Sequence, residues 1–293
     1  MNGLGARIWG SRGSVAVSGR GYERHGGNTS CVQVLTGDGG PAIILDAGTG
    51  LRPLGQALAA QDAREIHLFL SHLHLDHLQG LAFFTPLYVR EVELHIWGPA
   101  SPTRPLRDRV GAYMSEPLFP VNVADVPCTA VFHDAPEDGV TIDGVDVWAS
   151  PVAHQGSTVG YRIEHAGRSL VYISDHEPAL ACDLRTMDTS WISGYSLAAR
   201  ADVLLHDSQY FEHEYPSRMG WGHSSVDHAV AFTQVCGVGQ LVLFHHDPAH
   251  DDDTLRAKLA RALELWGDEP TPPVLAYDGM ELAVDAAVSA ATR

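Results

Sequence analysis

Cysteine is scarce in this chain, and its spacing argues against two kinds of site. No two of the cysteines form a C-x-x-C pair, and they lie far apart, at Cys31, Cys128, Cys182 and Cys236. A disulfide framework and a thiolate metal site both need cysteines at closer, regular spacings. We therefore predict reduced cysteines buried in the core of a cytoplasmic protein.

Long apolar runs and basic residues are also few. No apolar run approaches the length that spans a bilayer, and residues 1–7 lack the apolar centre of a secretory signal. The chain has 19 lysines and arginines against 36 aspartates and glutamates, a formal net charge of -17. A long nucleic acid needs a basic surface, so we expect neither such a partner nor a membrane. Two bound divalent cations would still make one site locally positive and suit a small anionic substrate.

No repeat, charge block or low-complexity linker divides the 293 residues. Hydrophobic residues make up 45% and charged residues 19%, which is typical of a soluble globular enzyme. We predict one domain over residues 1–293. Residues 99–126 are rich in proline and arginine, and we interpret them either as a flap over an active-site cleft or as an ordinary connection. Arginines on a flap could meet an anionic substrate.

The densest group of chemically capable residues follows an apolar run at 66–70 that predicts a buried strand. Four metal-capable side chains fall within six positions: His72, His74, Asp76 and His77. Alternate residues of an extended segment point the same way, so the first two can converge on one ion. A following helix would leave Asp76 and His77 beside a second ion. Imidazole and carboxylate are ligands that suit Zn²⁺ and similar metals.

Further apolar runs that predict strands also end in histidine or aspartate. These ends are Asp46, His154, Asp175, Asp207 and the pair His245-His246. Charged and imidazole groups at neighbouring strand ends form the edge where α/β folds build their sites. His154 would complete a three-histidine site, and Asp175 could bridge two ions. We favour Asp46 as the carboxylate that orients a ligand histidine, over a simple turn or cap role, because ligand histidines usually donate their second N–H to such a group.

The segment His72-Leu73-His74-Leu75-Asp76-His77 resembles the HxHxDH signature of the metallo-β-lactamase superfamily. The resemblance implies an α/β fold: an αββα four-layer sandwich of two mixed β-sheets flanked by helices, with a dinuclear metal site along one edge. It implies two divalent metal ions, with Zn²⁺ favoured and Mn²⁺ as the alternative, and one ligand set. That set is His72, His74 and His154 for one ion, Asp76, His77 and His245 for the other, and Asp175 between them. The strand pattern alone leaves open whether His245 or His246 is the ligand.

Two further segments resemble motifs of the ribonuclease Z-like phosphodiesterases: His206-Asp207-Ser208 and Gly222-His223-Ser224-Ser225. In that branch an acidic residue and a histidine assist protonation of the leaving group. The resemblance therefore implies that Asp207 holds His223 and that His223 protonates the departing alkoxide. The second segment is also typical of a helix N-cap, and both roles are compatible. Asp76 is expected to orient the nucleophile as well as to bind metal.

The resemblance implies a dinuclear metal-dependent hydrolase. We expect it to act on a small phosphodiester or cyclic nucleotide through a metal-bridging hydroxide. No basic Gly/Pro-rich arm of the kind ribonuclease Z uses for tRNA is recognisable. A lactonase or thioester hydrolase would use the same metal site and stays the alternative. A di-iron oxidoreductase is disfavoured by His74, where such proteins commonly carry a carboxylate, and a metal-free relative conflicts with the full ligand set. A homodimer is left open as the assembly.

The remaining pattern predicts a helix at 78–84, further helices at 225–236 and 251–266, and a strand meander formed by 131–133, 140–142 and 145–149. A closing hairpin is expected at 274–284, around Asp278-Gly279. The glycine-rich loop at 10–29 is either a plain hairpin or a lining of the metal cleft.

Overall fold

The strands form two seven-stranded sheets. The computed structural model describes residues 3–37, 40–178, 180 and 182–284. The first sheet contains, in spatial order, β14 (Glu281–Ala283), β1 (Gly5–Gly10), β2 (Cys31–Leu35), β3 (Ala42–Leu45), β4 (Glu65–Phe69), β5 (Glu93–Gly98) and β6 (Thr129–Asp134). The second contains β13 (Val274–Leu275), β12 (Gln240–Phe244), β11 (Val203–Asp207), β10 (Arg168–Ile173), β9 (Val159–His165), β8 (Val145–Pro151) and β7 (Val140–Ile142).

Each sheet is mixed in the same way. Strands β14, β1, β2 and β3 pair antiparallel, whereas β3, β4, β5 and β6 pair parallel. In the second sheet β7 to β10 pair antiparallel and β10 to β13 pair parallel. The parallel strands β4 and β12 are almost wholly buried apolar runs, and β8 alternates buried and half-buried residues. These are the patterns expected for strands covered on both faces and for strands covered on one.

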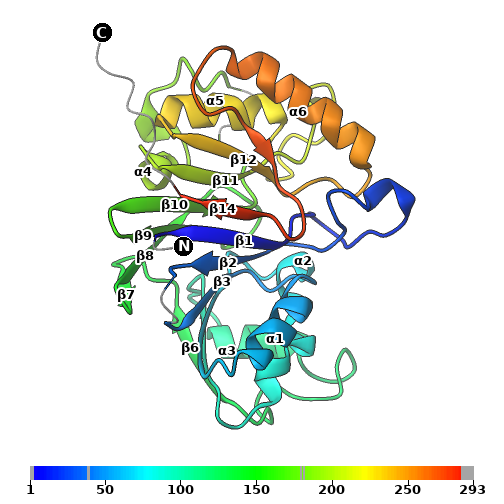
Figure 1. The fold of residues 1–293 in the computed structure, drawn as a ribbon, viewed down its shortest axis with the longest axis vertical. Coiled ribbons are helices and arrows are strands. Elements are labelled where there is room, and N and C mark those ends of the chain that lie inside the picture. Colours follow the sequence, from blue (N-terminus) through cyan, green and yellow to red (C-terminus); the bar gives the residue numbers. More distant parts are fainter. Residues whose placement is uncertain (1–2, 38–39, 179, 181, 285–293) are drawn as a thin grey trace.

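Helices cover the outer faces of both sheets (Figure 1). The first sheet carries α1 (Leu51–Ala60), α2 (Leu75–Leu78) and α3 (Leu106–Tyr113), and the second carries α4 (Tyr195–Ala198), α5 (Val226–Cys236) and α6 (Asp252–Trp266). Short 3₁₀ helices are η1 (Arg20–Tyr22), η2 (Leu81–Phe83), η3 (Thr85–Tyr88), η4 (Thr189–Trp191) and η5 (Tyr215–Ser217). The predicted αββα arrangement is confirmed. Among the described residues, no helix combines the length and apolarity that a bilayer crossing requires.

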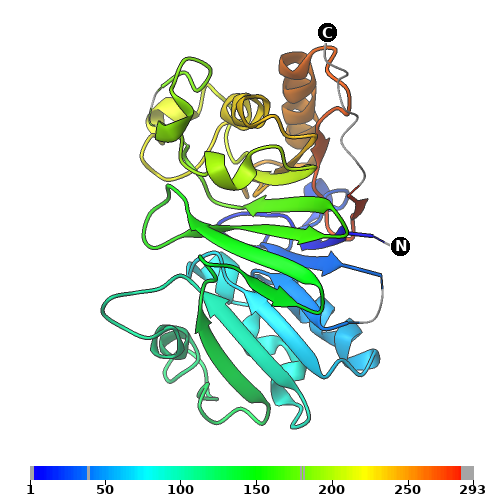
Figure 2. The same ribbon diagram turned by 90° about the vertical axis from the view of Figure 1, so that its left-hand side faces the viewer.

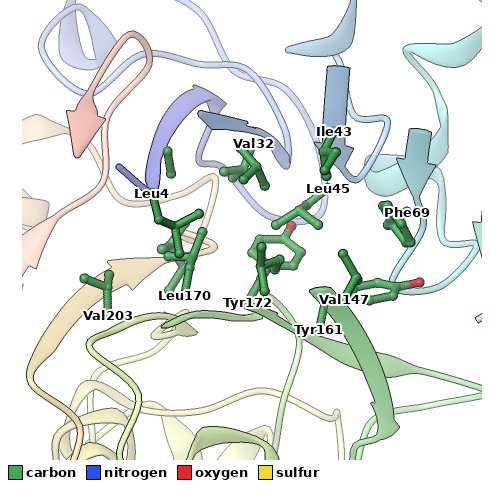
Figure 3. Packing of buried hydrophobic residues seen from close by; sticks show 14 of the residues in the cluster. Leu4, Val32, Ile43, Leu45, Phe69, Val147, Tyr161, Leu170, Tyr172 and Val203 are labelled. Carbon is green, nitrogen blue, oxygen red and sulfur yellow. The ribbon is translucent and has the colours of Figure 1, made fainter. Parts of the chain in front are cut away.

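One apolar core lies between the two sheets, which face each other in Figure 2. Leu45 and Phe69 of the first sheet pack toward Tyr161 and Tyr172 of the second (Figure 3). The rings of Phe69 and Tyr161 meet edge to face, with centroids 5.4 Å apart. This shared core fixes the two sheets relative to each other, and with them the strand ends that carry the site.

Three predicted elements differ from the structure. The helix expected at 78–84 is instead α2, which ends at Leu78, followed by the 3₁₀ helix η2. Between them Gly80 lies against the backbone of Gly48, where an added Cβ would be 2.0 Å from the carbonyl oxygen. That close approach of two backbones breaks the helical run, and only glycine permits it.

The other two differences concern strand partners. The strand at 131–133 is not part of a meander, because β6 pairs parallel with β5 in the first sheet while β7 and β8 lie in the second. The segment 274–284 is not a hairpin. Its β13 pairs with β12 and its β14 pairs with β1, so it crosses from one sheet to the other. Alternating hydrophobicity predicts strands but carries no information on their long-range partners.

Residues 99–126 contain one helix, α3, whose Leu106, Val110 and neighbouring Met114 are buried against the outer side of the first sheet. Arg104 and Arg107 line a surface cavity beside β6 that includes none of the predicted metal ligands. A contact between these arginines and an anionic substrate, expected only if the segment is a flap, stays a prediction. The flap itself stays a prediction.

Candidate metal centre

The predicted ligands meet in the segments that follow β4, β8, β10 and β12. They fall into two groups, and within each group the ligand atoms lie within 4.8 Å of one another. The first group is His72, His74 and His154, and the second is Asp76, His77, Asp175 and His245. The sequence predicted this division, and the seven side chains come from both sheets.

The first group presents bare imidazole nitrogens to a common centre. His154 Nδ1 lies 2.7 Å from the carbonyl oxygen of Gly222, so it donates there and leaves Nε2 as a lone pair. That Nε2 is 3.3 Å from Nδ1 of His74. The Nε2 of His72 is buried and has no hydrogen-bond partner among the described residues. A buried nitrogen without a partner is costly unless something absent from the polypeptide satisfies it.

The second group is more deeply buried. His77 Nε2 and His245 Nε2 lie 3.3 Å apart, and Asp76 Oδ2 is 3.2 Å from each. Asp175 Oδ1 is 3.1 Å from His77, while its Oδ2 is 3.3 Å from His245. The same Oδ2 is 3.9 Å from His72 and 3.8 Å from His154. Asp175 therefore lies between the two groups, where a bridging ligand belongs.

Hydrogen bonds behind the two buried histidines decide which nitrogen faces the centre. His77 Nδ1 donates to Asp46 Oδ2 at 2.7 Å, and His245 Nδ1 donates to Gln209 Oε1 at 3.0 Å. In that tautomer the inward Nε2 of each ring is the atom available to a cation. Burial opposes charge on His77, but Asp175, Asp76 and Asp46 outweigh it and hold the pKa of this imidazole well above its usual range. Five imidazoles and two carboxylates around such a centre fit divalent cations of the zinc type.

Asp46 is the positioning carboxylate that the sequence predicted. It is fully buried after β3 and accepts from Ser71 N at 2.7 Å, from Tyr172 Oη at 2.7 Å and from His77. Burial raises the pKa of Tyr172 well above its usual range, so the hydroxyl stays protonated and donates. Tyr172 was missed at the sequence level because a tyrosine in an apolar strand is typical of core packing.

Asp207 and His223 form a second pair beside the cluster. His223 Nδ1 lies 2.7 Å from Asp207 Oδ2. Burial would lower the pKa of His223, but the charge and hydrogen bond of Asp207 outweigh it and raise the pKa to about 9. The helix-cap interpretation also holds, because Ser225 accepts from the backbone N–H of His228 at the start of α5. His206, the other histidine of that motif, points away and stacks on Phe232.

The choice between the two adjacent histidines is settled by geometry. His245 faces Asp76 and Asp175, whereas His246 Nε2 lies 3.0 Å from the carbonyl oxygen of Ala276. His245 adopts a left-handed conformation with φ 57. The chain therefore turns sharply after β12, and strand alternation could not have predicted which imidazole enters the site.

The glycine-rich loop at 10–29 lines the cleft. Ser14 N donates to Asp76 Oδ2 at 2.6 Å, and a Cβ at Gly13 would lie 2.5 Å from the His245 ring. Gln209 Nε2 lies 3.4 Å from Ser14 Oγ, so the amide that orients His245 also contacts this loop. Sequence reasoning missed Gly13, Ser14 and Gln209 as individuals. The glycine-rich composition of the loop was the one available signal, and Gln209 carried none.

Comparisons with known proteins agree with this architecture. Residues 42–246 match a family model described as a beta-lactamase superfamily domain. Ribonuclease Z of Mycobacterium sp. (strain KMS) is 29% identical over 230 residues, covering 72% of this chain and 75% of that protein. The crystal structure of the metallo-beta-lactamase fold protein YhfI from Bacillus subtilis has a TM-score of 0.67 at 17% identity, covering 95% of this chain and 98% of that one. A diphosphatase from the PhnP family has a TM-score of 0.64 at 15% identity, covering 96% and 97%.

The two solved structures share the fold at low identity, and the family model spans most of the chain, including every predicted ligand from His72 to His245. The resemblance seen in the histidine motif is therefore confirmed over the whole sandwich. The chain belongs to the metallo-β-lactamase superfamily, where it resembles ribonuclease Z, and it is a metal-dependent hydrolase.

Proposed function

We propose that this protein is a dinuclear phosphodiesterase that hydrolyses a small phosphodiester, with cyclic nucleotides as the first candidates. The observation that carries the proposal is the pair of Asp207 and His223 next to the metal ligands. An alkoxide is a poor leaving group, and a carboxylate that holds an imidazolium beside it is a sound general acid. A thiolate leaves without such help, which disfavours the thioester hydrolase alternative.

Each residue has a distinct role in this proposal. Divalent cations held by the seven ligands would polarise the phosphoryl group and acidify a water molecule. Asp76 orients the attacking oxygen, while Asp46 and Gln209 keep His77 and His245 in the tautomer that presents Nε2. His223 delivers a proton to the departing oxygen, and Asp207 holds its Nδ1 throughout.

Three observations support a small substrate. The net charge of -17 is unfavourable for a general grip on RNA, and a cavity of about 310 Å³ adjoins His223. A volume near 300 Å³ is at the small end for ligand pockets. Arg104 and Arg107 lie outside the site. The relatives named ribonuclease Z make RNA the competing substrate, so it belongs in the same assay.

A substrate panel tests the proposal. Protein loaded with Zn²⁺ or Mn²⁺ is assayed against bis-p-nitrophenyl phosphate, 2′,3′- and 3′,5′-cyclic nucleotides, an acyl lactone, a thioester and a precursor RNA with a 3′ extension. We expect turnover of the diesters by the wild-type protein and loss of that turnover in His154→Ala. The matched control His165→Ala should keep it, because this imidazole lies on β9 away from the cluster. Turnover of the lactone or thioester alone would reject the phosphodiesterase assignment. Cleavage of the RNA alone would reject the small substrate.

A further inference from the structure

We propose that the cavity beside His223 binds a planar aromatic ring carried by the leaving group, with the indole of Trp221 as its stacking face. The proposal rests on the phosphodiesterase function above and specifies the substrate of that site. The cavity has a volume of about 310 Å³ and is lined by Ser14, Gln155, Gln209, Tyr210, Trp221 and His223. A nucleoside is the simplest group with such a ring and a hydroxyl that can serve as the leaving oxygen.

Trp221 is exposed on a loop that is firmly held. Its side chain is 56% exposed, yet both flanking residues are fixed by one buried carboxylate. Glu177 accepts from Gly220 N at 2.9 Å through Oε1 and from Gly222 N at 2.9 Å through Oε2. The hydroxyl of Tyr215 also donates to Glu177, at 2.6 Å. The exposure of the indole is therefore set by the fold, because a loosely held loop would let this large apolar surface turn inward.

The same loop positions a metal ligand. The carbonyl oxygen of Gly222 accepts from His154 Nδ1 at 2.7 Å. Gly222 has φ 88, and a Cβ there would lie 2.3 Å from that nitrogen. Trp221 thus has a fixed place relative to the cluster, one residue from a backbone group that orients His154. A ring stacked on the indole would be held at a defined distance from the reacting phosphorus.

Apart from His223, whose imidazole also contacts the metal ligands, the cavity lining carries no charged side chain, which suits a neutral ring better than a second phosphate. Its six lining residues include no lysine, arginine, aspartate or glutamate. The nearby Arg218 lies over the Tyr210 ring, 4.8 Å from the centroid, and 3.7 Å from a carboxylate oxygen of Glu214. Gln155 donates to the carbonyl oxygen of Gly220 at 3.0 Å, which holds its amide at the cavity wall. Amide and hydroxyl groups around an indole match the polar edge and apolar faces of a heteroaromatic base.

The position of His223 assigns the ring to the leaving group. Its imidazole lines the cavity and also contacts the ligands, with ring centroids 5.0 Å from His154 and 5.1 Å from His245. A phosphorus at the cluster and a leaving oxygen at His223 direct the rest of the leaving alcohol into this cavity. The hydroxyl that takes the proton from His223 therefore belongs to the nucleoside, which stays attached to the phosphate when the substrate is a cyclic nucleotide.

Binding of two monophosphates tests the pocket directly. Titration calorimetry on the metal-loaded protein compares adenosine 5′-monophosphate with ribose 5-phosphate, which lacks the base. Stacking of one base on an aromatic residue predicts affinity for the nucleotide about tenfold or more above that for the sugar phosphate. Trp221→Ala should abolish this preference, Trp221→Phe should keep most of it, and the control Trp191→Ala should leave it unchanged because that 78%-exposed indole does not line the cavity.

The outcomes separate this proposal from the one on which it rests. Equal affinity of the wild-type protein for both ligands, or a preference that survives in Trp221→Ala at full metal content, would overturn the pocket. Nucleotide preference that depends on Trp221 in a protein that hydrolyses no phosphodiester would support the pocket and refute the proposed reaction. Diester turnover with the same KM in wild type and Trp221→Ala would support the reaction and refute the pocket.

Discussion

His223 Nδ1 lies 2.7 Å from Asp207 Oδ2, and the Asp207 carboxylate also accepts the backbone N–H groups of His176 at 3.0 Å and Gln209 at 2.9 Å. Three donors hold this carboxylate in one orientation, so the imidazole is presented to the cavity at a fixed angle. In the proposed reaction, this fixed orientation would let the pair deliver a proton without rearrangement.

Replacing His223 separates proton delivery from metal binding. We expect His223→Ala to keep its metal content and to slow turnover by about 10²-fold or more, the usual scale for general acid catalysis. The loss should be smaller for a diester whose leaving group is p-nitrophenol, because that anion departs without a proton. Metal analysis and kcat for the two leaving groups check this. Loss of metal in the variant would show that His223 is a ligand.

Replacing His74, in contrast to replacing His223, should reduce the metal content. His74 lies with His72 and His154 in the three-histidine group, and its nitrogen is 3.3 Å from that of His154. We expect His74→Ala to lose one equivalent of metal and nearly all activity, because it removes one of the three imidazoles that face this ion. Metal analysis after dialysis gives the stoichiometry. A fully loaded, active variant would contradict the ligand assignment.

Metal removal should destabilise the fold. Without cations, only imidazoles balance the charge of the buried carboxylates Asp76 and Asp175, and His77 Nε2 and His245 Nε2 lie 3.3 Å apart. A cation present at 1,000 times its dissociation constant adds about 4 kcal/mol to the free energy of unfolding. Thermal melts with chelator and after readdition of Zn²⁺ should show a large, reversible shift in Tm. An unchanged Tm would mean that these ligands bind no structural cation.

Lys258 should make stability depend on pH. Its Nζ is fully buried and donates to the carbonyl oxygens of Ser208 at 2.7 Å and Gln209 at 2.8 Å. Burial lowers the pKa of this amine to about 7 in the folded protein, from 10.5 in an exposed chain. Between those values the unfolded chain binds a proton that the folded protein lacks, so this group makes the free energy of unfolding rise with pH, by about 1.4 kcal/mol per pH unit at most.

The comparison is with Lys258→Met, which fills the same space without titrating. Urea denaturation of both proteins is measured from below pH 7 up to pH 10, and between pH 7 and pH 10 the free energy of unfolding of the wild type should climb relative to that of the variant. Below pH 7 the two curves should run parallel, because the amine is then protonated in both states. Parallel curves across the whole range would show that Lys258 stays charged in the folded protein.

The grouping of the candidate metal ligands was predictable from the sequence for a physical reason. His72, Asp175 and His245 each follow an apolar run, and parallel strands end at a common edge, so local pattern and topology point to the same place. Apart from Asp46, the residues behind these ligands were not predictable. Tyr172, Glu177 and Gln209 act through contacts with segments distant in sequence, and a single buried polar residue gives no signal of its partner. The predicted pairing of β6 and β14 was wrong for the same reason, because the pattern of one strand gives no signal of its partner.

The segment after β12 passes from the second sheet to the first, and at the crossing Asp278 Oδ2 accepts the backbone N–H groups of Gly27 and Asn28 at 3.1 and 3.0 Å. The loop that lines the cleft is therefore anchored by residues made some 250 positions after it. On the ribosome, the first strands emerge long before this anchor exists. The loop beside the metal ligands can therefore take its anchored conformation only after Asp278 has been synthesised.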